Sequence, residues 1–413
     1  MGSATHSLAF VVDRWLHLPE EIYEDIIKRL ELGDLLRFSF VCQTWKSLVS
    51  SLLPPKLNPW LLVPYGGYKS AEGTVWDKNL GFCDYPNETI YRVEMPEIAG
   101  CRICGSCRGG WLITMHENGE IQLLHPFSRA VINLPQLTTL PGVAGSFIDE
   151  NNDRVYDILT SYGNEDHRQN IISTSIREFY IYKAVMSSYN SRTGIVMAIY
   201  GLSRHLTFCR PGKDQTWTPL KGDVDGRFTD ITFYKGKFYA VQSGGSVFVV
   251  DGLDTSSPFV RFFIASPMGC VLDKYYLIES LGEMLWIRRT RYKPGGVCDD
   301  SEEDPPSYET SDFQVRKLVV NVPKWVDVND LGDNRALFVG YNDSFSLSTS
   351  DLPGFRGNSI YFTDDNLKEY TDQPFGGHDL GSYNINDGYV GEWYPADSNF
   401  IKPPPVWFTT NSS

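Results

Sequence analysis

The sequence predicts a mainly β protein with a small α-helical N-terminal module: three short helices followed by a β-propeller of six or seven blades. Apolar residues at helical spacing occur only within residues 15–53. From Trp60 onwards, short segments rich in valine, isoleucine and aromatic residues alternate with glycine, proline, asparagine and aspartate. Of the 413 residues, 42% are hydrophobic and 14% aromatic, enough to build a large core. A pair of β-sandwiches is the alternative fold.

The first helix is predicted from apolar residues that share one face. Ile22, Ile26, Ile27 and Leu30 fall at i, i+4, i+5 and i+8, which matches a 3.6-residue period. Pro19 suits the first helical turn, where a missing backbone N–H costs nothing. Two glutamates follow it, at the end where the helix dipole favours negative charge.

Two further short helices are expected before residue 54. Asp34 can cap a second helix after Gly33, and a third begins near Thr44 and ends before Pro54 and Pro55. Helices of this length are marginal in water without tertiary packing. Three of them expose more apolar surface than they can cover among themselves, so the missing part of their core is predicted to come from another protein.

This stretch resembles an F-box over about 35 residues, because several of its motif positions occur in the expected order. The residues that carry the resemblance, and that it implies bind an adaptor, are Leu18, Pro19, Ile22, Ile26, Leu30, Leu35, Val41, Cys42 and Trp45. One departure is Gln43, where many F-boxes have a basic residue. The alternative is an ordinary amphipathic helical hairpin packed on its own domain.

The domain boundaries follow from changes in composition. Residues 1–14 are predicted to be a flexible tail, and residues 15–53 the F-box. Residues 54–59, with the sequence PPKLNP, form a short stiff linker. Residues 60–413 form the propeller-like domain, which is interrupted by a long loop at 141–175 and an acidic loop at 295–312.

The predicted strands of this domain recur in groups of three, and the second, third and fourth groups begin about 40 residues apart. The groups are 110–114, 120–124 and 130–135; 195–200, 205–209 and 215–220; 236–241, 246–250 and 260–264; 274–279, 284–288 and 313–319; a fifth begins at 357–362. The last segment, Pro404–Thr409, is predicted to pair with the first, Trp60–Val63, which would close the ring and remove its open edges.

The predicted propeller-like domain, residues 60–413, also resembles a known family. Residues 105–112 are similar to a "GSxxGWL" blade start, and residues 125–128 followed by Leu134-Pro135 are similar to an "NP-F/T…LP" pattern, with His125 in place of asparagine. Residues 208–218 and 234–240 supply two further matches. Together these segments resemble the C-terminal propeller-like domain of plant F-box proteins of the KIB type.

Few residues suggest chemistry. Cys101, Cys104 and Cys107 have a metal-like spacing, but no fourth ligand follows at matching spacing, so they are interpreted as free cysteines and no metal or cofactor is expected. The seven histidines are scattered, and no nucleophile elbow or Walker-type loop occurs. Asp364 and Asp365 are interpreted as turn residues, because nothing marks them as an acid and a base.

Charge and targeting signals restrict the partners and the location. The net charge of −14 opposes nucleic acid and anionic membranes, and no basic run offers a nucleic-acid footprint. No apolar run approaches the ~20 residues of a membrane span, and the N-terminus lacks a secretory signal. The eight cysteines do not indicate a disulfide framework. The protein is therefore expected in the cytoplasm, the nucleus or both.

The acidic run 299–304 is interpreted as a solvated loop between two strands. The functional alternative is that this run binds a basic surface of a partner.

The resemblance implies a substrate receptor of a Skp–cullin–F-box ubiquitin ligase, with no catalytic residue in this chain. The F-box would dock on a Skp-type adaptor and through it on a cullin. The loops of the propeller would bind a target protein and bring it close to the ubiquitin-conjugating enzyme, which raises the effective concentration. Two alternatives remain open: a non-proteolytic F-box scaffold, and a propeller enzyme, which should place acids or metal ligands on one face of the ring.

Overall fold

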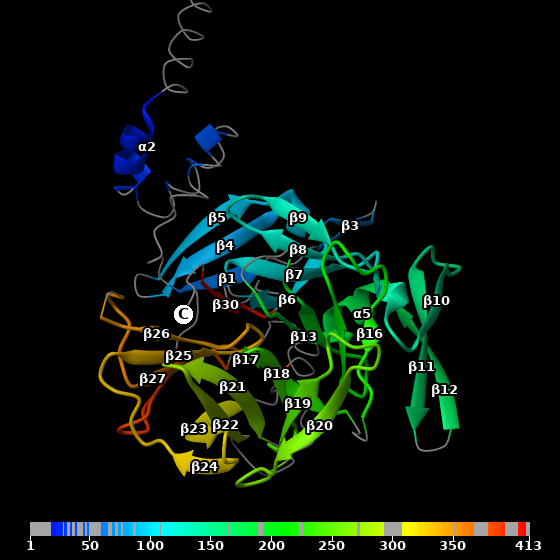
Figure 1. Ribbon diagram of the computed structural model, residues 1–413. Coiled ribbons are helices and arrows are strands. Elements are labelled where there is room, and N and C mark those ends of the chain that lie inside the picture. Colours follow the sequence, from blue (N-terminus) through cyan, green and yellow to red (C-terminus); the bar gives the residue numbers. More distant parts are fainter. Residues whose placement is uncertain are drawn as a thin grey trace, which may run out of the picture.

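The computed structural model gives the protein a helical N-terminal segment and a ring of β-sheets (Figure 1). The structure describes residues 18–27, 29–30, 34, 38, 44–45, 48, 59–64, 68–70, 73–75, 77–85, 88–107, 109–162, 165–188, 193–222, 226–270, 273–292, 308–350, 352–366, 379–392 and 404–409. Among these residues, no helix has the length and apolar character needed to cross a membrane. The predicted tail at residues 1–14 lies outside the described residues.

Six sheets of four or five strands make up the ring in the described part of the chain. Sheet 1 contains β30 (Val406–Phe408), β1 (Trp60–Pro64), β4 (Asn79–Asp84) and β5 (Thr89–Glu94). Sheet 2 contains β6 (Cys101–Cys107), β7 (Trp111–His116), β8 (Ile121–His125) and β9 (Ala130–Asn133). Sheet 3 contains β13 (Ile181–Met186), β14 (Val196–Tyr200), β15 (His205–Cys209) and β16 (Thr218–Pro219).

The other three sheets continue in chain order. Sheet 4 contains β17 (Phe228–Tyr234), β18 (Lys237–Gln242), β19 (Val247–Asp251) and β20 (Phe259–Ile264). Sheet 5 contains β21 (Lys274–Ser280), β22 (Glu283–Tyr292), β23 (Glu309–Val319) and β24 (Lys324–Asp327). Sheet 6 has the order β26 (Phe345–Ser348), β25 (Arg335–Val339), β27 (Ser359–Phe362), β28 (Gly381–Asn384) and β29 (Val390–Glu392).

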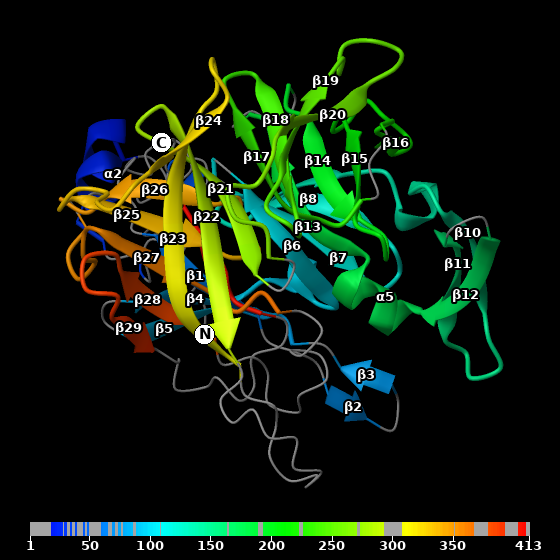
Figure 2. The ribbon, with the colours of Figure 1, turned by 90° about the horizontal axis from the view of Figure 1, so that it is seen from below.

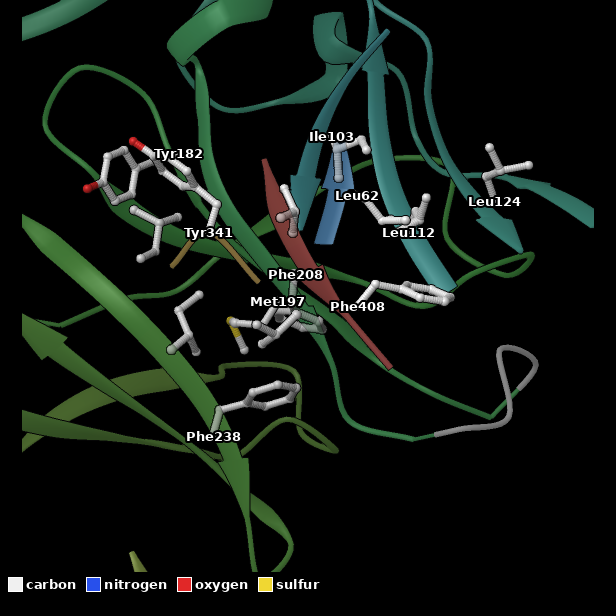
Figure 3. Packing of buried hydrophobic residues seen from close by; sticks show 14 of the residues in the cluster. Leu62, Ile103, Leu112, Leu124, Tyr182, Met197, Phe208, Phe238, Tyr341 and Phe408 are labelled. Carbon is white, nitrogen blue, oxygen red and sulfur yellow. The ribbon is translucent and has the colours of Figure 1, made fainter. Parts of the chain in front are cut away.

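The inner strands of neighbouring sheets contact one another in the order β30, β6, β13, β17, β21 and β26. Apolar clusters fill the spaces between neighbouring sheets all the way round the ring, and one of them joins sheet 6 to sheet 1. Figure 3 shows part of the largest cluster, where Leu112, Phe208 and Phe408 come together from three different sheets. This arrangement is a β-propeller, as the sequence predicts, and not a pair of sandwiches.

The predicted ring closure is confirmed. β30 pairs with β1 in antiparallel register, with Trp60 opposite Phe408 and Leu62 opposite Val406. The C-terminal strand therefore completes the sheet that the first strand begins. It covers the edge of β1 that faces away from β4.

Two predictions about the ring need correction. The segment 141–175, predicted as a loop, contains β10 (Val143–Ile148), β11 (Arg154–Tyr162), β12 (Glu165–Ile172) and the start of α5 (Ser173–Phe179). These three strands form a separate sheet beside the ring in both views (Figures 1 and 2). The first three predicted groups also begin at the second strand of their sheets, so the inner strands β6, β13 and β17 were not assigned.

Smaller elements complete the described chain. A hairpin of β2 (Tyr68–Ser70) and β3 (Gly73–Val75) lies between β1 and β4, and two 3₁₀ turns, η2 (Pro96–Ile98) and η3 (Leu137–Thr139), connect strands. In the N-terminal segment, α2 spans Glu20–Ile27. Asp34, Phe38, Thr44, Trp45 and Leu48 are also helical, at the places where the second and third helices are predicted.

Candidate functional site

Helix α2 presents different apolar side chains to the inside and to the outside. The carbonyl of Pro19 accepts hydrogen bonds from the backbone N–H groups of Ile22 and Tyr23, which starts the helix. Tyr23 and Ile27 are buried, Ile26 is half-buried, and the Ile22 side chain is 45% exposed. Among the described residues of this helix, Ile22 is therefore the apolar side chain most accessible to a partner.

An aromatic and aliphatic core holds the helical segment together. Trp45 stacks on Phe38 with 4.0 Å between ring centroids and meets the edge of Tyr23 at 6.1 Å. Buried Ile27 packs against Leu30, Phe38 and Leu48. Trp45 and Leu30 therefore stabilise the module from within.

A network of buried charges occupies the ring between sheets 5 and 6. Arg289 and Arg291 of β22 both contact Asp365 and Asp379: an Nη atom of Arg289 lies 2.9 Å from Asp379, and Nε of Arg291 lies 2.9 Å from the same carboxylate. The Tyr276 hydroxyl donates to Asp365 at 2.8 Å. The partners are up to 90 residues apart in the chain, so their clustering depends on the closed ring.

The two neighbouring aspartates of this network differ in pKa. Burial and the nearby charge of Asp379 raise the pKa of Asp364 to about 6, and Asp364 accepts a hydrogen bond from Tyr308. Burial acts in the same direction on Asp365, but Lys274, Arg291 and Arg289 outweigh it and hold the pKa of Asp365 well below its usual range. The sequence Asp364-Asp365 alone does not reveal this difference in pKa. The difference is caused by Asp379, Lys274, Arg289 and Arg291, which are distant in the sequence.

A second group lies around two tyrosines, and we call it the tyrosine–cation site: Arg102, Tyr182, Arg204, Lys274 and Tyr341. The Tyr182 and Tyr341 rings meet edge to face at 5.6 Å and are seen side by side in Figure 3. The Lys274 ammonium lies 4.5 Å from the Tyr182 ring centroid and 3.3 Å from Asp365, which connects the site to the network.

A buried ion pair connects sheets 3 and 4. Lys183 of β13 pairs with Asp230 of β17 and donates to the Gly340 carbonyl at 3.2 Å. The second carboxylate oxygen of Asp230 accepts the backbone N–H of Leu277 at 2.8 Å. Lys183 and Asp230 are buried, so each compensates the charge of the other.

The cysteines at metal-like spacing lie together on β6. Burial raises the pKa of Cys101 to about 12 and of Cys104 to about 11, and it raises that of Cys107 well above its usual value. Burial therefore disfavours the thiolate form of all three cysteines, and a metal would have to displace the thiol protons to bind them. In the described part of the chain, no group of three or more histidine, cysteine or acidic residues could hold a metal ion.

Among the described residues, the buried charges of the ring pair with one another and join segments that are far apart in the sequence. Each carboxylate of the network contacts an arginine, a lysine or a tyrosine hydroxyl. The acids expected for a propeller enzyme are present, but they are buried and engaged by residues of the same chain.

Comparison with known proteins places the chain in a family. A family model described as "KIB1-4 beta-propeller" matches residues 82–384, and one described as "F-box domain" matches residues 15–57. The chain belongs to the KIB1-4 beta-propeller family and carries an F-box. F-box protein SKIP23 of Arabidopsis thaliana is 29% identical, with 96% of each chain covered. F-box protein At2g17036 of the same plant is 27% identical, with 96% of this chain and 95% of that protein covered.

The F-box residues predicted from the sequence separate into three groups. Pro19 and Ile22 are exposed, and Leu18 and Ile26 are half-buried, so these four can reach a partner. Leu30 and Trp45 pack against other residues of the F-box. The remaining three lie outside the described residues: Leu35, Val41 and Cys42. F-box proteins are typically non-catalytic adaptors, and neither of the two matching family models describes an enzyme.

Proposed function

We propose that this protein is the substrate-recognition subunit of a Skp–cullin–F-box ubiquitin ligase. The F-box docks on a Skp-type adaptor and through it on a cullin, and the propeller binds a target protein for ubiquitination and degradation. The observation that carries the proposal is the F-box itself, where Ile22 is 45% exposed beside a core closed by Tyr23 and Trp45. The chain contributes no catalytic group, because binding places target lysines near the charged ubiquitin-conjugating enzyme.

A pull-down with a Skp-type adaptor tests the docking. Ile22→Asp places a charge on the exposed face of α2 and leaves the inner core untouched, so adaptor recovery should fall at least tenfold. Val322→Asp is the matched control, because Val322 is 66% exposed on the ring. Full recovery by the Ile22→Asp protein, or failure of the unaltered chain to recover the adaptor, would show that the docking hypothesis is wrong.

Degradation is tested separately from docking. A non-proteolytic scaffold would bind the same adaptor, so proximity labelling should first identify proteins that the intact chain finds and the F-box alone does not. The half-life of those proteins should lengthen when Ile22→Asp replaces the unaltered chain. Unchanged half-lives would favour the scaffold.

The proposal also includes a cytoplasmic or nuclear location. All six cysteines that the structure describes are free thiols, as expected where glutathione keeps thiols reduced. A fluorescent fusion of the full chain should be seen in the cytoplasm, the nucleus or both. Accumulation in the secretory pathway would contradict this part of the proposal.

A further inference from the structure

The tyrosine–cation site contains more positive than negative charge. Among the residues that the structure describes, neither Arg102 nor Arg204 forms an ion pair with a carboxylate. Lys274 does contact Asp365, but it shares that carboxylate with Arg289. The site therefore carries an excess of cations in a chain whose net charge is −14.

The buried end of the site is held firmly in place. Arg102 is 1% exposed and donates to the Ile181 carbonyl at 2.7 Å, while its guanidinium lies 5.5 Å from the Tyr341 ring centroid. Its Nε has no acceptor among the described residues. Backbone carbonyls and the Tyr341 ring stabilise this buried guanidinium, so Arg102 adds positive charge to the site with no described carboxylate to balance it.

The surface end of the site is Arg204, which is only half-buried. It lies in the β14–β15 turn, so it is at the same face of the ring as the amino end of β13, where Tyr182 lies. Its guanidinium is 4.2 Å from the Tyr182 ring centroid. This stacking fixes one face of the guanidinium and leaves its edge, with the N–H donors, for other contacts.

The backbone at Arg204 is in an uncommon conformation. Arg204 has φ 53° and Arg227, in the adjacent connection, has φ 59°. The two segments are joined by backbone hydrogen bonds from Arg227 to the Ser203 carbonyl and from Phe228 to the Arg204 carbonyl. Six other non-glycine residues in the described part of the chain also have positive φ, so this conformation does not by itself mark a site. It does place the two arginines next to each other, in turns that hydrogen-bond to one another.

The electrostatics of Tyr182 agree with this charge excess. Burial raises the pKa of the Tyr182 hydroxyl, but the charges of Lys274 and Arg204 and the hydrogen bond from Lys274 outweigh it, so the pKa lies below its usual value. The site therefore favours negative charge at this position. Asp365 acts in the opposite direction on the pKa of Tyr182, but the two cations outweigh it.

We propose that the tyrosine–cation site binds an oxyanion of the target protein, either the carboxylate of an acidic side chain or a phosphoryl group, and that Arg204 contacts it directly. The proposal rests on the proposed function, since it names the chemistry of the target that the propeller would select. Arg227, which is exposed beside Arg204, can extend the contact to a second acidic residue. Planar guanidinium groups suit carboxylate and phosphate equally.

Fluorescence anisotropy on the full-length chain tests the proposal. The probes are three labelled peptides of one sequence that carry four phosphoserines, four glutamates or four glutamines. Arg204→Asn removes the charge while asparagine tolerates the left-handed conformation. Loss of one charge-assisted hydrogen bond corresponds to about a tenfold weaker Kd for the acidic peptides.

Lys235→Asn is the matched control. Lys235 also has positive φ (45°) and also lies over a tyrosine ring, at 4.9 Å from the Tyr234 centroid. It lies in the β17–β18 turn, at the opposite face of the ring from Arg204. Its replacement should change the Kd of the acidic peptides less than twofold.

The outcomes distinguish a phosphoryl group from a carboxylate as the bound oxyanion. They also distinguish failure of oxyanion binding from failure of the proposed function. Tighter binding of the phosphoserine peptide indicates a phosphorylated target, and equal binding indicates a carboxylate. Equal affinity for the glutamine peptide, no binding of either acidic peptide, or an unchanged Kd in Arg204→Asn would each overturn the proposal. Failure of adaptor recovery by the unaltered chain would refute the proposed function and leave the peptide result standing.

Discussion

Replacing Trp407 with alanine should open the propeller at its closing sheet. Trp407 is fully buried on β30, between sheets 1 and 6. Its ring lies 5.1 Å from Phe338, 5.7 Å from Tyr85 and 6.2 Å from Tyr361, measured between ring centroids. Truncating a buried tryptophan to alanine costs roughly 3–5 kcal/mol. Because domains are stable by only about 5–15 kcal/mol, this loss alone approaches the whole stability of the ring.

Trp407→Phe separates packing from hydrogen bonding at the same position. The indole N–H of Trp407 has no acceptor among the described residues. A buried, unsatisfied donor costs about 1–3 kcal/mol, so phenylalanine removes this penalty while it loses part of the packing. The Phe variant should therefore be within about 2 kcal/mol of the unaltered protein.

Urea denaturation of the full-length chain measures both effects. The midpoint should fall strongly for Trp407→Ala and little for Trp407→Phe, with tryptophan fluorescence and far-UV circular dichroism as the two probes. A chain that ends at Thr409 keeps all of β30 and is the control for the C-terminus. If Trp407→Ala lowers the free energy of unfolding by less than about 1 kcal/mol, β30 does not hold the ring closed.

Two further predictions concern the buried charges. Asp364→Asn should stabilise the protein by about 3 kcal/mol at pH 8 and by little at pH 4, because the folded pKa of about 6 exceeds the ordinary aspartate pKa of 3.8. The raised pKa means that the unaltered protein loses stability as pH rises from about 4 to 6; identical urea midpoints for both proteins at pH 8 would contradict this. Asp230→Asn should cost roughly 3–5 kcal/mol because it leaves Lys183 buried without its partner; the double variant Asp230→Leu with Lys183→Met should be less destabilised, and an equal loss would refute the explanation.

Local patterns in the sequence were sufficient where burial follows the period of the element. The alternating and continuous apolar segments predicted the outer strands and the pairing of β1 with β30, and the 3.6-residue spacing predicted α2. The inner strands β13 and β17 were missed because each has a buried charge, Lys183 or Asp230, in a position that a strand pattern reserves for apolar residues. That charge is tolerated only because the partner lies on the next sheet.

Contacts between distant segments also explain why β12 and the charge network could not be predicted from the sequence. β12, with the sequence EDHRQNII, has the composition of a loop, and it forms a strand because β11 pairs with it over its whole length. Asp365 has partners on β21 and β22, and the hydrogen bond with Arg291 spans 74 residues of sequence. Contacts of this range depend on the order in which sheets close the ring, which no local spacing records.

Because the tyrosine–cation site depends on ring closure, Trp407→Ala and Arg204→Asn should differ in their effects on stability. Tyr182 comes from sheet 3, Lys274 from sheet 5, and Tyr341 follows β25 of sheet 6, so the site exists only when those sheets are in place. Trp407→Ala should therefore abolish binding of the acidic peptides, although Trp407 is not part of the site. Arg204→Asn should weaken that binding and leave the urea midpoint unchanged, because Arg204 lies at the surface end. Both proteins should still recover the adaptor, since the F-box has a core of its own around Trp45. A joint loss of adaptor and peptide binding in Arg204→Asn would show that this residue acts through folding and not through recognition.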